Sequence, residues 1–421
     1  MRIGASHADI TPTPPVDLNG YIRRFGKATG VHDPLLANAL FVESGGTAAI
    51  LVSLDLLTIS NATADELRQR ISKELGIDKG SVFLSAIHTH SAVGGPYLRN
   101  AGREDPAWTS WFEDQVVRAC EEAASQAREA SLLSYEAYSA VGVNRRNEAR
   151  GIDPHVPFVL AVSGNEVIAW LINYGCHAVS LTEENLQISA DYVYYLREYL
   201  YRHVGYQFPV LFFNGGSGDV DPRWRGSFDA ARATGERLAN ELLLVTRAYE
   251  GERVTGELSY GSRKLSIPYA WHPSVAEAEE NLESCLRKVE TAASAEEKKI
   301  AGAFRLWAEE VLELARKGTL PTALEVEIGY LKIGELVLVA VPLEVFSSIS
   351  LKMRKRIAAH YVFVASYTNG YSGYLADKAA YEEGGYEVDE WHKYAGLLPQ
   401  VPQAEDLFFE ALRRVLDAAV N

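Results

Sequence analysis

Cysteine is scarce in this chain, with only 3 among 421 residues. Cys120, Cys176 and Cys285 are far apart in the sequence, and none belongs to a C-x-x-C pair. An odd number of widely spaced cysteines argues against a disulfide framework and against a cysteine-rich zinc knuckle. The N-terminus, residues 1–7, lacks the apolar core of a secretory signal, and no run is long and apolar enough to span a bilayer. We therefore expect a soluble, cytoplasmic protein in a reducing compartment.

Excess positive charge is missing as well, because 56 acidic residues against 41 Lys and Arg give a formal net charge of −15. This balance argues against nucleic acid and anionic membrane surfaces as partners. Hydrophobic residues make up 47% of the chain and charged residues 23%, which is typical of a packed globular protein. The expected partner is a small-molecule substrate, without nucleic acid and without membrane insertion, and the oligomeric state is left open.

The alternation of apolar and amphipathic segments predicts an α/β protein. Apolar runs typical of strands alternate with helical patterns in the first half, and the expected strands are 47–57, 81–86, 157–172 and 208–213. A charged helical stretch at about 273–317 predicts a helical hairpin inserted between later strand-like segments. We predict a mixed β-sheet core covered by helices, forming one large catalytic domain over residues 1–421 with that helical insertion.

Two short histidine-bearing segments follow predicted strands. His88 and His90 come after the strand at 81–86 and precede a loop of small residues at 91–96, and His177 follows a second apolar run. Loops at strand ends are where α/β proteins gather reactive groups. Imidazole is the commonest side-chain ligand of zinc at neutral pH. Two such segments from distant parts of the chain therefore predict a metal site.

His90 is the stronger candidate of the first pair. On a regular strand, His88 and His90 would point to opposite faces because one residue separates them, although this alternation can fail at a strand end. The glycines Gly94 and Gly95 of the following loop would let a substrate approach closely. Cys176, next to His177, is interpreted as a small buried residue rather than as a nucleophile.

A glycine-rich loop at 214–222 follows another apolar strand. It lacks the lysine of a P-loop, so it does not predict nucleotide binding, but its backbone N–H groups are suited to stabilising an oxyanion. Ser217 is a candidate nucleophile, although its surroundings differ from the G-x-S-x-G elbow. Asp219 is a turn former or a catalytic acid. Glu344, which follows a later apolar strand, is a charge at a helix N-terminus or a metal ligand.

Several motifs, in order along nearly the whole chain, resemble the catalytic domain of the neutral (non-lysosomal) ceramidase family. The most distinctive is His88-Thr89-His90-Ser91, which is similar to the family's H-T-H-S-G-P-x-G. The other matching segments are Ala8–Thr11, Gly20–Tyr21, Gly30–His32, Asp55, Val143–Arg145, Asn173–His177, Ile188–Asp191, Val341–Val345, Asn369–Tyr374, Tyr381 and Tyr386–Glu387. One such motif would be weak, whereas a series in the family's order is specific.

The resemblance implies the family's fold and a zinc ion (Zn2+) held by His90, His177, Glu344 and Tyr374, taken position by position. A mixed nitrogen and oxygen shell leaves room for a water molecule on the metal ion, and the ion lowers the pKa of that water towards ~7. The family's catalytic loop carries a serine where this chain has Gly215. A metal-activated water is therefore the expected nucleophile. The predicted catalytic residues are Arg145 near the substrate carbonyl or oxyanion, with Tyr374, Ser217, Asp219 and His88.

These observations predict a zinc-dependent hydrolase that cleaves an amide, ester or lactone bond of a small soluble substrate. The chain ends soon after the tyrosine segment, without the C-terminal β-sandwich domain of larger family members, and shows no signal peptide. Both departures weaken the case for a membrane-derived ceramide. A genuine ceramidase acting on a lipid amide, with a role in lipid metabolism, is the first alternative. The others are a metal-binding protein without turnover and a metal-free hydrolase that uses Ser217.

Overall fold

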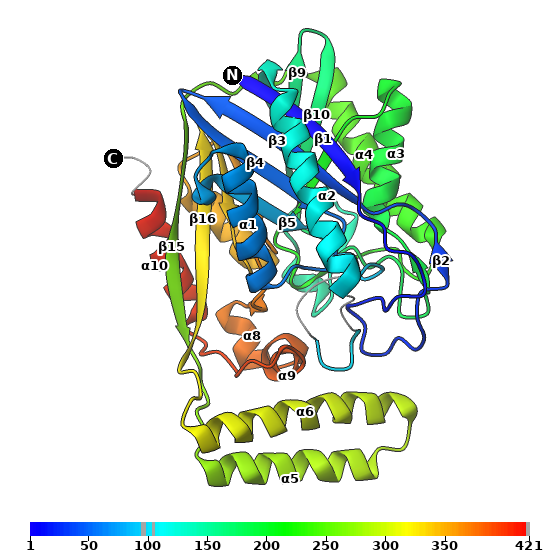
Figure 1. Ribbon diagram of the computed structural model, residues 1–421, viewed down its shortest axis with the longest axis vertical. Helices are drawn as coiled ribbons and strands as arrows, with labels where there is room; N and C mark the ends of the chain where they lie inside the picture. Colours follow the sequence, from blue (N-terminus) through cyan, green and yellow to red (C-terminus); the bar gives the residue numbers. More distant parts are fainter. Residues whose placement is uncertain (94–97, 103–105, 418–421) are drawn as a thin grey trace.

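The computed structural model describes residues 1–93, 98–102 and 106–417. Gly94, Gly95 and Pro96 of the predicted substrate loop lie outside the described residues. Three main β-sheets share one apolar core, and helices cover their outer faces (Figure 1). The predicted mixed sheet core covered by helices is confirmed, with several sheets in place of one.

The first sheet has the strand order β5-β4-β3-β1-β6. Its strands are β1 (Arg2–Asp9), β3 (Leu36–Ser44), β4 (Thr47–Leu54), β5 (Val82–Ala86) and β6 (Arg128–Glu129). β4 and β5 are parallel and are joined through α1 (Asn61–Leu75). α1 and α2 (Pro106–Ser125) cover the outer face of the sheet. Ser60, rather than Asn61, caps α1 by accepting a hydrogen bond from the backbone N–H of Thr63.

The second sheet has the order β12-β10-β9-β7-β14. Its strands are β7 (Ser131–Tyr138), β9 (His155–Ser163), β10 (Glu166–Tyr174), β12 (Val210–Asn214) and β14 (Glu252–Arg253). β9 and β10 form the hairpin expected at 157–172. β10 and β12 are parallel, with α3 (Tyr192–Val204) between them in the chain. Asp191 caps α3, and α4 (Phe228–Ala248) packs on α3 and β7.

The third sheet has the order β15-β16-β17-β19. Its strands are β15 (Leu258–Pro268), β16 (Ala323–Ile333), β17 (Leu336–Ala340) and β19 (Tyr361–Ala365). β17 and β19 are parallel, and α7 (Ser347–Arg356) lies between them in the chain. The C-terminal helix α10 (Ala404–Asp417) packs against β15 and β16.

A helical hairpin of α5 (Val275–Thr291) and α6 (Ala295–Lys317) interrupts the chain between β15 and β16. Ser274 and Ser294 begin these helices with capping boxes, which satisfy the free N–H groups of the first turn. Figure 1 shows the hairpin at the end of the molecule opposite the N-terminus. α6 buries Phe304 and Trp307 against α9 (Trp391–Ala395). The hairpin is therefore anchored to the body of the protein.

The segment after β19 has no clean sequence period, and it folds into short pieces. These are β20 (Tyr374–Leu375), α8 (Lys378–Glu383), a π-helical turn (Tyr386–Glu390) and α9. The remaining short elements are β2 (Gly30–Val31), β8 (Gly142–Asn144), β11 (Gln187–Ile188), β13 (Val220–Pro222), β18 (Glu344–Val345) and the 3-10 turns Lys79–Ser81 and Glu148–Arg150. Of the helices that the structure describes, none combines the length and apolarity needed to cross a lipid bilayer.

Each main sheet contains one parallel strand pair, and the carboxyl ends of these pairs meet. Asn214, at the end of β12, donates from Nδ2 to the carbonyl of Ile87 just after β5, at 3.1 Å. Ser366, just after β19, donates its backbone N–H to Asn214 at 2.9 Å. Asn369 donates in the same way to Leu84 of β5, at 2.7 Å. Side chains that follow β5, β10, β12 and β19 are thereby brought together, as is common at the strand ends of α/β proteins.

The buried imidazole of His392 provides a test of how α9 packs against α6. Burial lowers its pKa to about 3, whereas an exposed histidine in the unfolded chain titrates near 6.5. The unfolded chain therefore binds an extra proton between these values, and stability falls as the pH falls through that window. We expect the wild type to lose about 2 kcal/mol more unfolding free energy than His392→Gln between pH 7 and pH 5. Equal losses in urea titrations at the two pH values would contradict this burial.

Candidate metal centre

Three histidines meet at the carboxyl ends of the parallel strands. His88, His90 and His177 each offer a ring nitrogen, and these atoms lie within 4.8 Å of one another. The Nε2 atoms of His88 and His90 are 3.3 Å apart. β5 ends at Ala86, and His88 has a left-handed φ of +66°, so the alternation of a strand does not continue. The opposite orientation of a regular strand is therefore not adopted, and both rings join one cluster.

Backbone carbonyls fix the protonation of two of these rings. His88 Nδ1 lies 2.8 Å from the carbonyl oxygen of Leu57, and His177 Nδ1 lies 2.6 Å from that of Ser217. A carbonyl oxygen only accepts hydrogen bonds, so both Nδ1 atoms must carry the proton. Burial also lowers the pKa of His88 to about 3, which keeps the ring neutral at pH 7. The Nε2 atom of His88 is therefore left with a lone pair, and in both rings Nε2 is the nitrogen that faces the cluster.

The carboxylate of Glu344 lies against these Nε2 atoms. Its Oε2 is 3.2 Å from His177 Nε2 and 3.6 Å from His88 Nε2. The side chain of Glu344 is only 3% exposed. Tyr371 donates its hydroxyl to Oε1 at 2.6 Å, and Tyr367 donates to Oε2 at 3.1 Å. Burial opposes the charge of Glu344, but the imidazoles and the Tyr371 hydroxyl lower its pKa to about 2, so this position holds a carboxylate suited to binding a cation.

Tyr374 and Arg145 form the next layer around the cluster. Arg145 donates from Nη2 to the hydroxyl of Tyr374 at 3.0 Å, and it pairs with Glu387 at 2.9 Å and with Asp221 at 3.5 Å. Burial opposes the charge of Arg145, but Tyr374 and the two carboxylates raise its pKa above the usual value. Its side chain is 24% exposed, so a fixed positive charge beside the cluster remains open to solvent.

The tyrosine segment brings more hydroxyl groups to the cluster than the resemblance implies. Tyr374 pairs with Glu344 on the neighbouring strands β18 and β20, its hydroxyl accepts a hydrogen bond from Arg145, and its part as a metal ligand stays a prediction. Tyr371 and Tyr367 make the hydrogen bonds to Glu344. Sequence reasoning missed both, since the crowding of tyrosines in this segment is equally typical of core packing. The N-x-Y motif that contains Tyr371 was the available signal.

Ser217 and Asp219 lie beside the cluster, and other groups of the fold already engage them. The buried Ser217 hydroxyl is 3.0 Å from that of Tyr367. Asp219 accepts hydrogen bonds from the backbone N–H of Ser347 and from Asn144 Nδ2, each at 2.7 Å. Burial raises the pKa of Asp219, and these donors oppose that rise. The structure thus gives Asp219 a clear role in joining the glycine loop to α7.

The glycine loop offers fewer free N–H groups than its composition suggests. The backbone N–H groups of Gly215, Ser217 and Gly218 donate to the carbonyls of Tyr174, Gly215 and Val345, respectively. Groups already hydrogen-bonded in this way are not free to stabilise an oxyanion. Arg145 is therefore the better placed donor for that role. Cys176, beside the loop, is fully buried, and burial raises the pKa of its thiol, which agrees with its interpretation as an unreactive residue.

The N-terminal loop packs behind His90. The ring of Tyr21 meets the His90 ring edge-on at 4.7 Å, and Arg24 donates from Nη1 to the His90 carbonyl at 2.7 Å. Gly20 has a φ of +105°, and a Cβ added there would lie 2.6 Å from His90 Cγ. The Nδ1 atom of His90 is buried and has no hydrogen-bond partner among the described residues. Close packing, rather than a hydrogen bond, therefore holds this ring.

Replacing Gly20 should displace His90. Gly20→Ala forces a Cβ into the imidazole and also strains the backbone, whereas Gly226→Ala, at a φ of +98°, has open space around its Cβ. Both variants should lose about 1 kcal/mol through backbone strain. Only Gly20→Ala should shift the side-chain nitrogen resonances of His90 in a histidine-labelled NMR spectrum. Identical His90 resonances in the two variants would contradict the packing described here.

Comparison with known proteins bears on this arrangement. Residues 1–127 match the family model of the neutral/alkaline non-lysosomal ceramidase, N-terminal. A stretch of 101 residues is 34% identical to neutral ceramidase 2 of Arabidopsis thaliana, which is 23% of this chain and 13% of that protein. The crystal structure of neutral ceramidase from Pseudomonas aeruginosa is similar with a TM-score of 0.76 and 22% identity, over 98% of this chain and 73% of that chain. A ceramidase structure described as complexed with C2 is similar with a TM-score of 0.74 and 20% identity. This likeness covers 98% of this chain and 75% of that chain.

The two kinds of likeness support different statements. The structural similarity, at identities of 20% and 22%, shows the fold of the whole described chain. The sequence match covers the N-terminal region, which includes the H-T-H-S motif of His88 and His90. Both agree with the resemblance drawn from the motifs. Residues 1–127 thus match the model of the neutral/alkaline non-lysosomal ceramidase family, and the described chain has the fold of the ceramidase structures.

Proposed function

We propose that this protein is a zinc-dependent amidohydrolase whose ion is held by His88, His90, His177 and Glu344. The observation that carries the proposal is the buried cluster itself. Imidazole nitrogens and a carboxylate converge there at 3.2 to 3.6 Å from one another. A divalent cation is the group that binds to all of these donors at once.

The spacing and chemistry of the donors fit zinc. Zinc bonds to imidazole nitrogen and carboxylate oxygen are about 2.0–2.2 Å, so neighbouring ligands of a four- or five-coordinate ion lie roughly 3–4 Å apart, and a fifth position can take a water molecule. The distances between His88 and His90, His177 and Glu344, and His88 and Glu344 are 3.3, 3.2 and 3.6 Å. A nitrogen-rich shell favours zinc over magnesium or calcium, which prefer oxygen ligands. The proposed set adds His88 to His90, His177 and Glu344, which the resemblance also implies.

The residues around the cluster have separate tasks. Zinc, when bound, supplies a Lewis acid that lowers the pKa of a coordinated water to about 7. Tyr367 and Tyr371 orient the Glu344 carboxylate through their hydroxyls. Arg145 places a permanent positive charge where the carbonyl oxygen of a substrate becomes negative. Burial and the nearby Glu344 raise the pKa of Tyr374, so its phenol keeps a proton that it can give to a leaving nitrogen.

An amide is the bond that we propose is cleaved. The similar proteins are named ceramidases, and ceramide is an amide. A polar cavity lined by Arg24, Lys27 and Lys299 borders the cluster, which supports a small polar substrate in place of a lipid. True ceramidase activity remains the runner-up. A metal-free hydrolase that uses Ser217 is less well supported, since the hydroxyl is buried against Tyr367.

Metal analysis of two variants tests the proposal. The purified protein should contain about one zinc ion per chain. His177→Ala should lose the zinc and reduce amide hydrolysis about a thousandfold, because several kcal/mol of transition-state stabilisation disappear with the ion. A chelator should abolish amide hydrolysis by the wild type, and added zinc should restore that activity.

Ser217→Ala is the matched control for this experiment. It should keep its zinc and most of its activity, because Ser217 is only a neighbour of the cluster in our account. Retained zinc and unchanged hydrolysis in His177→Ala would refute the proposal. Loss of activity in Ser217→Ala together with resistance to chelation would favour the serine hydrolase.

A further inference from the structure

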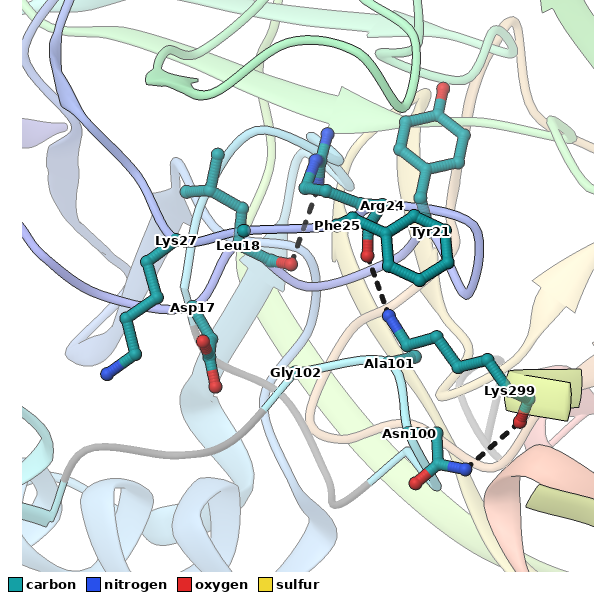
Figure 2. Close-up of a pocket in the computed structure, with 11 residues that line it drawn as sticks. Asp17, Leu18, Tyr21, Arg24, Phe25, Lys27, Asn100, Ala101, Gly102 and Lys299 are labelled. Carbon is teal, nitrogen blue, oxygen red and sulfur yellow. Dashed lines mark hydrogen bonds between the residues drawn. The ribbon is translucent and has the colours of Figure 1, made fainter. Parts of the chain in front are cut away.

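A cavity of about 400 Å³ lies behind His90, between the loop at 17–27, residues 100–102 and α6 (Figure 2). Two residues of its lining also contact the metal centre: Tyr21 packs on the His90 ring, and Arg24 donates to the His90 carbonyl. A cavity of this size, one side chain away from the cluster, can receive part of a molecule whose other part is at the metal.

Arg24 carries a buried charge that forms no salt bridge with the acidic side chains of the described residues, although Glu183 is near enough to raise its pKa. The residue is 3% exposed, and its guanidinium donates to the backbone carbonyls of Leu18 at 3.4 Å, His90 at 2.7 Å and Thr182 at 3.4 Å. Its Nε has no partner, and none of the described acidic side chains forms a salt bridge with it. Burial lowers the pKa of Arg24 only to about 10, so the group is charged at pH 7. An uncompensated buried cation is costly, and an anionic ligand removes that cost.

Other charges of the cavity have the same sign. Lys27 and Lys299 join Arg24 in the lining, and Asp17 is the acidic residue among them. Among the described residues of the lining, three basic residues against one acidic residue make the cavity locally positive, whereas the whole chain has a net charge of −15. A positive cavity in an acidic protein attracts small anions and repels cationic ligands.

The helical hairpin α5–α6 supplies one wall of this cavity. Lys299 of α6 donates from Nζ to the Arg24 carbonyl at 2.6 Å, and Asn100 donates to the Lys299 carbonyl at 3.0 Å. Glu296, one turn earlier, pairs with Arg23 at 2.6 Å. Figure 2 shows Lys299 reaching from its helix to the loop that carries Arg24. The insertion therefore holds the loop in place and adds a positive charge to the cavity.

We propose that this cavity binds an oxyanion carried by the substrate, a carboxylate or a phosphate, so that the amide cleaved at the metal centre belongs to an acidic molecule. The assignment of this oxyanion to a substrate rests on the proposed hydrolase function. Anion binding by the cavity does not depend on that function, so the two can be tested separately.

Calorimetric titration of the full chain with glutarate and with inorganic phosphate tests the cavity directly. Lys299→Met and Arg24→Met should each weaken the binding of the preferred anion about tenfold or more, because each removes a positively charged hydrogen-bond donor from the cavity. Lys299→Met also removes the hydrogen bond that holds the Arg24 carbonyl. Lys298→Met is the matched control, since it removes the same charge from an exposed neighbouring position of α6, and its affinity should equal that of the wild type. The anion that binds more tightly identifies the type of oxyanion that the cavity prefers.

Hydrolysis of paired amides tests the link to the reaction. The pair consists of an amide with a terminal carboxylate, or phosphate if that anion binds better, and its uncharged analogue. The wild type should prefer the charged member about tenfold in kcat/KM, Lys299→Met should lose most of that preference, and Lys298→Met should keep it.

The outcomes separate the two proposals. Anion binding that is equal in the wild type, Lys299→Met and Lys298→Met, or absent for both probes, overturns the inference even if amides are hydrolysed. Anion binding that persists in a protein without hydrolysis leaves the cavity assignment standing and overturns the proposed function. If Arg24→Met fails to fold, the comparison of Lys299→Met with Lys298→Met decides the result.

Discussion

The candidate site depends on one constraint, the burial of three imidazoles and a carboxylate in a single cluster. Carbonyl oxygens accept hydrogen bonds from Nδ1 of His88 and of His177, and both Nε2 atoms then face the Glu344 carboxylate. Removing such groups from water costs several kcal/mol unless they are compensated. A bound cation would be attracted to each of these groups. The folded state and the metal centre are therefore expected to stabilise each other.

The fold holds these groups together by joining the ends of its parallel strands. Asn214 donates to the Ile87 carbonyl of the first sheet and accepts from Ser366 of the third, so a single residue links three sheets beside the cluster. Asp219 connects the glycine loop to α7 in a similar way. Catalytic residues thus come from short segments after strands, while the sheets behind them supply rigidity. The helical hairpin takes part from a distance, by fixing the loop behind His90.

Much of this arrangement could be predicted from the sequence, because strands and helices leave a local period and strand ends attract reactive residues. The helix capped by Asp191 and the placement of His177 and Glu344 after strands follow from such patterns. The orientation of the His88 ring could not be predicted from these patterns, because the left-handed φ of His88 is set by tertiary packing. Which tyrosine meets Glu344 depends on the path of a segment without a period. The unpaired charge of Arg24 is visible only once distant carbonyls surround it.

Diffraction data collected above and below the zinc absorption edge, from crystals grown with zinc, test the central claim most directly. Our account predicts one anomalous peak per chain, at about 2.0–2.2 Å from a ring nitrogen of each of His88, His90 and His177 and from the Glu344 carboxylate. A zinc-supplemented crystal without density between these four side chains would contradict it. So would a peak bound elsewhere while the imidazoles and the carboxylate keep their present spacing.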